Sequence, residues 1–223
     1  INKGMKVIAM VIITGFLFSG TPSVAFDDGD FQQWSTISVT YKVNDDWKVT
    51  GEQEVRWGDD WDDFYYTHTD LGIVYGGVAD WLDLGVNYRE VYEEKSKNFV
   101  FENRPHFNVT LKTDIEGWAL SDRSRLEYRD KETDNNGWRY RNKLTLKAPF
   151  KLTKFEIRPY VADEVFVDLD AGDLNRNRVY GGVGCKLMEH VGAELYYLWQ
   201  ASENSSGDWV DYHALGAKLK FSF

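Results

Sequence analysis

The sequence predicts an all-β protein built as a single antiparallel transmembrane β-barrel, and three observations lead to this prediction. Apolar and polar side chains alternate with period two from residue 34 to the last residue, and no sustained helical periodicity follows residue 25. The chain is 16% aromatic and has only four Pro among 223 residues, a composition that favours strands. Its first segment is typical of exported proteins.

Residues 1–25 are predicted to be a signal peptide. Two lysines precede an apolar run over residues 7–18, and residues 23–25 supply a small-x-small cleavage site. The apolar run is shorter than the roughly 20 residues that a membrane-spanning helix needs. We therefore expect a barrel domain over residues 26–223 that is exported through a cleaved signal peptide.

Eleven segments of the mature chain alternate as strands do. Most of them are longer than an ordinary strand of a soluble protein and match a strand that crosses a bilayer at a tilt. The segments are 34–43, 47–57, 64–75, 81–91, 99–112, 117–130, 137–148, 154–166, 176–188, 191–202 and 209–223.

Three further patterns favour a membrane barrel over a soluble sandwich or a lipocalin-like barrel. Tight connections alternate with longer or more charged ones, as in outer-membrane barrels. The tight ones are 44–46, 76–80, 113–116, 149–153 and 189–190, and the longer ones are 58–63, 92–98, 131–136, 167–175 and 203–208. Most tryptophans lie near strand ends, at the depth of a membrane interface. The last five residues alternate and end in Phe223, which resembles the signal read by the bacterial barrel-assembly machinery.

The strand number depends on how the barrel closes. If the tight connections are periplasmic, segments 34–43 and 209–223 run in the same direction, so eleven strands would close in parallel. Bacterial single-chain barrels have even strand numbers. We therefore predict 12 strands, with residues 26–33 as the additional one, and 10 strands as the alternative.

The polar parity of the strands predicts a basic interior. Basic residues outnumber acidic ones on that parity by about two to one, and the acidic residues behind the net charge of −10 lie mostly in turns and loops. The candidate anion-binding residues are Arg89, Arg104, Arg123, Arg125, Arg129, Arg139, Arg141, Lys143, Arg158, Arg176 and Arg178. Their expected salt-bridge partners are Glu52, Glu54, Glu102, Glu127 and Glu164.

A hairpin around residues 131–136 would form the most basic wall. The expected facing pairs are Arg129 with Arg139, Glu127 with Arg141 and Arg125 with Lys143, and on the other flank Glu102 with Arg129 and His106 with Arg125. A positive wall favours anions. A lattice of paired charges that merely fills a narrow barrel is the structural alternative.

Several basic blocks resemble an uncharacterised family of Gram-negative outer-membrane barrels, described only as a domain of unknown function. The blocks are 102–106, 123–129, 138–143, 158–160 with Glu164, and 175–178. The resemblance implies the fold and the location and assigns no chemistry. In size and in its arginine-rich inner strands, the chain is also similar to the monomeric oligogalacturonate and sialic-acid channels, which implies a basic track for acidic sugars.

The predicted function is therefore an outer-membrane barrel that passes or binds small anionic solutes such as acidic saccharides. A closed structural barrel of the envelope is one alternative. A membrane hydrolase around His68, with Asp70 and Glu54 as weak catalytic candidates, is another. We expect lipid, lipopolysaccharide and the barrel-assembly machinery as partners. The acidic balance argues against nucleic acid, and the sequence indicates no cofactor and no metal.

Overall fold

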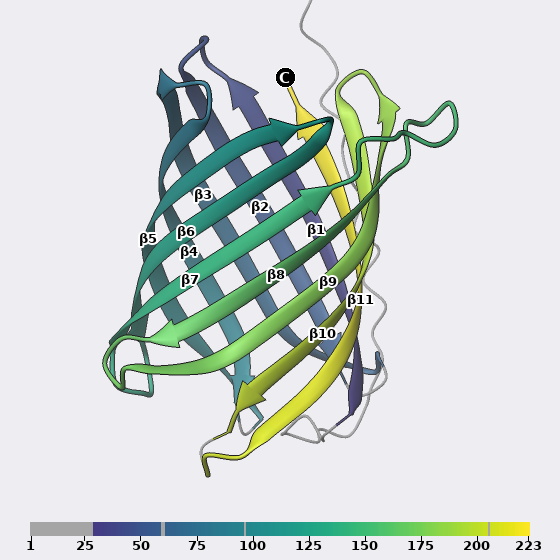
Figure 1. Cartoon of the computed structure of the whole chain (residues 1–223). Helices are drawn as coiled ribbons and strands as arrows, with labels where there is room; N and C mark the ends of the chain where they lie inside the picture. Colours follow the sequence, from purple (N-terminus) through teal and green to yellow (C-terminus); the bar gives the residue numbers. More distant parts are fainter. Residues whose placement is uncertain (1–28, 59–60, 96, 205) are drawn as a thin grey trace, which may run out of the picture.

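The computed structural model describes residues 29–58, 61–95, 97–204 and 206–223 (Figure 1). In this part of the chain eleven strands form one sheet that closes into a barrel, and there is no helix. The strands are β1 (Asp30–Lys42), β2 (Trp47–Gly58), β3 (Asp63–Ala79), β4 (Leu82–Lys95), β5 (Asn98–Ile115), β6 (Trp118–Lys131), β7 (Gly137–Lys147), β8 (Arg158–Asp168), β9 (Asp173–Met188), β10 (Val191–Glu203) and β11 (Trp209–Ser222). The predicted signal peptide lies outside the described residues.

No helix that is long and apolar enough to cross a membrane occurs in the described part of the chain.

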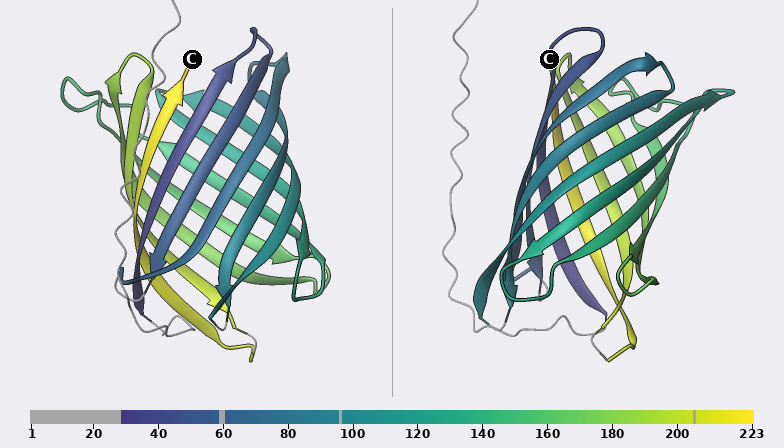
Figure 2. Two further views of the ribbon diagram at one scale, coloured as in Figure 1. Left: turned by 180° about the vertical axis from the view of Figure 1, so that it is seen from behind. Right: turned by 90° about the vertical axis from the view of Figure 1, so that its left-hand side faces the viewer.

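The barrel closes between β1 and β11, which run parallel, whereas all other neighbouring strands are antiparallel. Figure 2 shows β1 in purple beside β11 in yellow. The predicted strand numbers of 12 and 10 are therefore wrong, and the parallel closure that argued against eleven strands is the one found. Residues 30–33 form the start of β1 rather than an additional strand, because Gln33 already pairs with Trp57 on one side and Leu215 on the other.

The two ends of the barrel carry different connections. The end with Phe223, at the top of Figure 1, is called the C-terminal rim, and the other end the loop rim. The C-terminal rim carries connections 43–46, 80–81, 116–117, 148–157 and 189–190, and the loop rim carries the connections that follow β2, β4, β6, β8 and β10. The longest connection, 148–157, lies among those expected to be tight, because β8 begins at Arg158 rather than at residue 154.

The period-two alternation sorts the side chains onto two faces. Apolar residues on the outer face are exposed, as Leu71 (62%) and Val86 (65%) show, whereas Glu127 on the inner face is 0% exposed. Exposed tryptophans lie at both rims: Trp47, Trp81 and Trp118 at the C-terminal rim, and Trp61, Trp138 and Trp209 at the loop rim. The barrel is thus apolar outside and charged inside, the reverse of a soluble protein.

Polar side chains on the outer face pair with one another. The Asn177 amide donates to Asp163 at 2.9 Å, and the Asn142 amide donates to Asp122 at 2.6 Å. Asn142 and Asp163 are the central residues of their 11-residue strands. Because each amide satisfies a carboxylate, these groups are less costly on an otherwise apolar face than unpaired ones would be.

Two glycines make room for a ring inside the barrel. A Cβ atom at Gly216 would lie 2.0 Å from the ring of Tyr196, and one at Gly182 would lie 2.7 Å from the carbonyl oxygen of Leu195. Tyr196 is buried beside Trp34 and other inner residues. The absence of a side chain at Gly216 is therefore a packing requirement of this wall.

We predict that Gly216→Ala lowers the free energy of unfolding by about 1–3 kcal/mol, because the new methyl group displaces the Tyr196 ring. Gly181→Ala is the matched control, since nothing lies within 4 Å of its Cβ position on the outer face. Urea titration followed by tryptophan fluorescence measures both variants. Equal effects of the two substitutions would contradict this packing role.

Candidate anion-binding interior

The candidate residues predicted from strand parity lie on the inner face of the barrel at different depths. Six of the candidate arginines are buried, namely Arg89, Arg104, Arg125, Arg139, Arg141 and Arg178. Arg123, Arg129, Lys143, Arg158 and Arg176 are partly exposed. Of the expected partners, Glu54, Glu102, Glu127 and Glu164 are buried, and Glu52 is partly exposed.

Glu127 and Glu164 join five arginines into one chain of ion pairs, namely Arg123, Arg125, Arg139, Arg141 and Arg178. Arg139 donates two hydrogen bonds to Glu127, at 2.8 and 2.5 Å, and Arg141 donates to Glu127 at 2.9 Å and to Glu164 at 2.7 Å. Arg123 donates to Glu164 at 2.9 Å. Because charge-assisted bonds are strong and both carboxylates are fully enclosed, these contacts fix the positions of the guanidiniums.

The facing pairs differ from the predicted ones by two residues. Glu127 faces Arg139 and Arg125 faces Arg141, whereas the predicted register placed Glu127 opposite Arg141. On the other flank His106 faces Glu127 rather than Arg125. A shift of two residues keeps every side chain on its face. The same residues therefore meet inside the barrel, with different partners.

Glu102 holds a second pair of guanidiniums. Arg104 and Arg129 each donate two hydrogen bonds to this carboxylate, at 2.6 and 2.8 Å. Two parallel bonds to one carboxylate fix the plane of each guanidinium. Arg104 and Arg129 are therefore positioned beside the main chain of ion pairs, with one carboxylate shared between two positive charges.

Of the weak catalytic candidates around His68, the structure places Glu54 beside the ring and pairs Asp70 with other side chains. The ring lies between two carboxylates, with Nε2 3.2 Å from Glu52 and Nδ1 3.7 Å from Glu54. Asp70 instead accepts a hydrogen bond from Arg89 at 2.8 Å and lies 3.5 Å from His106. A histidine between carboxylates fits a structural ion-pair network as well as proton transfer.

One group of side chains has the composition of a metal site. Ligand atoms of Glu52, Glu54 and His68 lie within 4.8 Å of one another. Both carboxylates already bind cationic side chains, because Glu52 accepts a hydrogen bond from Lys218 at 2.6 Å and Glu54 accepts one from Arg56 at 2.6 Å. A metal ion would have to displace these cations, so the donor set fits a metal poorly.

Arginines and aromatic rings alternate across the interior. The guanidinium carbon of Arg56 lies 3.6 Å from the centroid of the Trp34 ring and 4.1 Å from that of Tyr66. The order across the barrel is Tyr66, Arg56, Trp34, Arg178, Phe166 and Arg141, and we call this set the arginine–aromatic stack. Cation–π contacts of this kind stabilise charge in a desolvated place.

The rings of this stack were not among the residues predicted from the sequence. Trp34 shares the inward parity of Thr36, and Phe166 shares that of Glu164, so strand parity was the available signal. All three rings lie toward the loop rim, since Trp34 and Tyr66 are near the starts of β1 and β3 and Phe166 is near the end of β8. The stack therefore crosses the half of the barrel that is nearer the loop rim.

Positive charge exceeds negative charge in the interior. Among the described residues seven arginines and five carboxylates are buried: Arg56, Arg89, Arg104, Arg125, Arg139, Arg141 and Arg178 against Glu54, Asp70, Glu102, Glu127 and Glu164. In the same part of the chain, no carboxylate lies within 4 Å of Lys143 or Arg176, which instead face the rings of Tyr180 and Phe166. Cations enclosed in a barrel without a carboxylate partner are costly unless water or an anion accompanies them.

Four cavities follow one another through the interior. The central cavity, about 150 Å³, is lined by Arg123, Lys143 and three tyrosines among other residues. The arginine cavity, about 60 Å³, is lined by eight arginines and by Glu93 as its one carboxylate. Two larger cavities, about 340 and 290 Å³, lie at the C-terminal rim. The most strongly basic of these four cavities is thus also the smallest of them.

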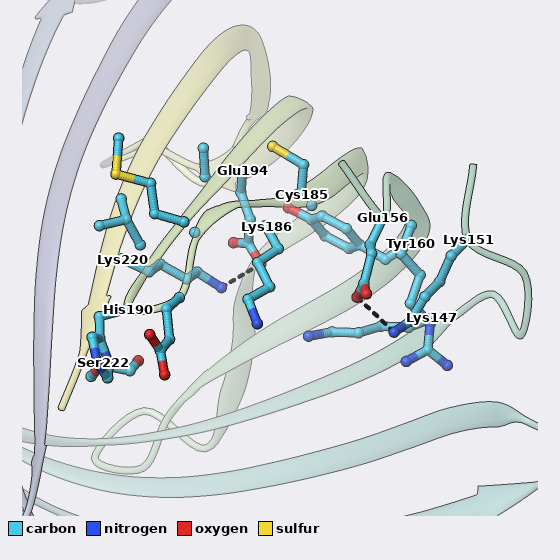
Figure 3. Close-up of a pocket in the computed structure, with 17 residues that line it drawn as sticks. Lys147, Lys151, Glu156, Tyr160, Cys185, Lys186, His190, Glu194, Lys220 and Ser222 are labelled. Atoms are coloured by element: carbon cyan, nitrogen blue, oxygen red, sulfur yellow. Dashed lines mark hydrogen bonds and ion pairs between the residues drawn. The ribbon is translucent and has the colours of Figure 1, made fainter. Parts of the chain in front are cut away.

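Arg158 has another role than the predicted one. Its guanidinium donates to the backbone carbonyl of Gly117 at 2.8 Å and also to that of Ala148. These contacts tie two connections of the C-terminal rim together, next to the bridge between Leu152 and Ile157. Arg158 therefore shapes the rim around the cavity of Figure 3, where Lys151 and Glu156 are paired.

The comparison with family models matches residues 31–211, from β1 into β11, to a family described as a protein of unknown function (DUF2490). No curated protein matches the chain significantly. The predicted membership of an uncharacterised family is therefore confirmed over most of the chain. Its outer-membrane location and the likeness to channels for acidic sugars stay predictions.

We predict that Glu127→Gln lowers the free energy of unfolding by about 3–5 kcal/mol, because it leaves Arg125, Arg139 and Arg141 without their shared carboxylate in the interior. Glu156→Gln, which removes an equivalent ion pair from an exposed connection, should leave stability nearly unchanged. Chemical unfolding of both variants under the same conditions measures the difference. A similar loss of unfolding free energy in both variants would show that the inner ion pairs stabilise the fold no more than an exposed pair does.

Proposed function

The chain belongs to this family of proteins of unknown function, DUF2490, and on that premise we propose that it is a barrel of the Gram-negative outer membrane that binds small anionic solutes in its interior. The C-terminal rim then faces the periplasm, as short turns do in such barrels, since four of its five connections have only two or four residues. Lipid, lipopolysaccharide and the barrel-assembly machinery are the partners that follow from this location.

The outer surface supports the location. An apolar outer face, strands of 11 to 18 residues and exposed tryptophans at both rims match the requirements of a bilayer. A closed sheet satisfies its backbone groups internally, which hydrocarbon demands. In water the same surface would expose apolar side chains around the whole barrel, which favours aggregation.

The excess of buried cations is the observation that supports anion binding. Seven arginines share five carboxylates, and Lys143 and Arg176 have no carboxylate within 4 Å among the described residues. A barrel filled only for stability needs matched charges, because each uncompensated charge raises its free energy. A small anion in the cavities would supply the missing negative charge.

The packing favours binding over free passage. The arginine–aromatic stack crosses the interior, and the cavity beside it measures only about 60 Å³. Passage of a solute would require these side chains to move. A closed structural barrel of the envelope is a second candidate, favoured by the ion pairs of Glu127 and Glu164, and it predicts no saturable binding of any anion.

We predict that the double substitution Asp163→Leu, Asn177→Leu raises the free energy of unfolding in lipid vesicles by about 1–2 kcal/mol, because it removes a polar pair from the middle of a lipid-facing surface. Removing both partners leaves no unsatisfied group. Lys151→Leu with Glu156→Leu, an exposed pair on the C-terminal rim, is the control and should bring no gain. Destabilisation of the first variant in vesicles would argue that its surface faces water.

We predict that D-galacturonate raises the unfolding temperature of the detergent-solubilised protein in a saturable way, since a ligand that binds only the folded state stabilises it by about 2.7 kcal/mol at 100 times its Kd. D-galactose and sodium chloride of matched ionic strength are the controls. An equal shift with chloride, or none with any anion, would favour the closed structural barrel.

A further inference from the structure

We propose that the central cavity is the anion site, that its ligand is a hydroxylated organic acid of about monosaccharide size, and that this ligand enters only from the C-terminal rim. The inference rests on the proposed function and adds the place, the ligand class and the direction of entry. Its experiments separate its own failure from that of anion binding in general.

Cationic side chains form part of the lining of the central cavity, among them Arg123, Arg141 and Lys143. Among the described residues, the Nε atoms of Arg123 and Arg141 have no hydrogen-bond partner, and they lie beneath the cavity surface rather than on it. Lys143 has no carboxylate within 4 Å among the described residues, and its Nζ lies 3.6 Å from the centroid of the Tyr180 ring. Buried N–H groups without acceptors are costly. A carboxylate ligand would supply acceptor oxygens and a negative charge at this wall.

Tyrosine rings form another wall of the same cavity. Tyr160, Tyr180 and Tyr196 all line it. Tyr180 donates its hydroxyl hydrogen to Glu164 at 2.9 Å, whereas no hydrogen bond within the described part of the chain engages the hydroxyl of Tyr160 or Tyr196. Aromatic faces with polar tips suit a ligand that has both C–H surface and hydroxyl groups. Cationic side chains beside such rings therefore bind a hydroxylated acid more tightly than a bare inorganic anion.

The volume limits the size of the ligand. About 150 Å³ is several times the ~30 Å³ that one water molecule takes in the liquid. It is well below the ~300 Å³ at which pockets for drug-sized ligands begin. One sugar acid fits this space, and a chain of sugars does not.

The cavities define the direction of entry. Tyr160 and Glu194 line both the central cavity and the 340 Å³ cavity at the C-terminal rim, shown in Figure 3. Lys218 lines both the central cavity and the 290 Å³ cavity. Toward the loop rim the space narrows to the 60 Å³ arginine cavity and meets the arginine–aromatic stack. The interior is therefore a well with one open end.

Cations at the open end support the same direction. In the cavity of Figure 3, Lys220 is paired with Glu194 and Lys151 with Glu156. Lys147 and Lys186 also line this cavity, and within the described residues neither has a carboxylate within 4 Å. Positive charge at the mouth of a cleft raises the local concentration of an anion and speeds its entry.

The first experiment is calorimetric titration of D-galacturonate into the full-length protein and into Lys143→Met. We expect the affinity to fall at least tenfold, while the urea midpoint stays the same or rises, because Met fills the space without an unpaired charge. Lys112→Met, which removes a lysine paired with Asp83 at the rim, should bind as the wild type does. A decrease in stability that accompanies the loss would point to a merely structural role for Lys143.

The outcomes of this titration separate two failures. If the wild type binds D-galacturonate and Lys143→Met binds it equally well, the central cavity is not the site, although the proposed function stands. If the wild type binds inorganic phosphate as tightly as D-galacturonate, the ligand class is wrong. If the wild type binds no anion, the proposed function fails as well.

The second experiment tests the direction of entry. Cys185 is the single cysteine of the chain, so a Cys185→Ser background accepts one new cysteine at Lys186 on the C-terminal rim or at Asp134 on the loop rim. Each is biotinylated and capped with streptavidin, and the association rate of D-galacturonate is measured. We expect the cap at position 186 to slow association at least tenfold and the cap at 134 to leave it unchanged. Slowing by the cap at 134, or by neither cap, would overturn one-ended entry.

Discussion

A closed barrel with polar residues on its inner face forces all inward charges to share one enclosed space. Each inward charge has to find its partner within that space, because taking an ion out of water without compensation is costly. Glu127, at 0% exposure, binds three arginines, and Glu164 links one of them, Arg141, to Arg123 and Arg178. These shared carboxylates hold strands β6, β7 and β8 in one arrangement. The rest of the interior follows from how the remaining cations are accommodated.

The two halves of the barrel accommodate their inward-facing cations differently. Toward the loop rim, Arg56 and Arg178 pack against the rings of Trp34 and Phe166, which closes the interior. Toward the C-terminal rim the interior holds cavities, and Lys143, which packs against the Tyr180 ring, has no carboxylate within 4 Å among the described residues. Because the loop-rim half is filled and the C-terminal half is hollow, the interior is a well with one open end rather than a continuous pore. A bound anion is the simplest way to neutralise the open half.

Strand parity was the strongest guide in the sequence, because a period of two survives small errors in strand ends and in register. It predicted that Arg139 and Glu127 face inward, although their pairing was wrong by two residues. The predicted strand number was wrong because the rule that bacterial barrels have even strand numbers was preferred to the eleven alternating segments counted in the sequence. The stack around Trp34 was missed because the inward positions were sorted for charged side chains and not for aromatic rings. Cavity volumes depend on side-chain packing around Lys143 and could not be predicted from spacing.

The most direct test of an anion-filled interior is anomalous diffraction from crystals of the protein soaked in selenate, an oxyanion that scatters anomalously and is small enough for the wide end of the well. We predict an anomalous peak in the central cavity, within hydrogen-bond distance of Lys143 and Arg123. Peaks confined to the outer surface and the rims, with no anion inside the barrel, would contradict the claim that the excess buried cations are there to bind anions.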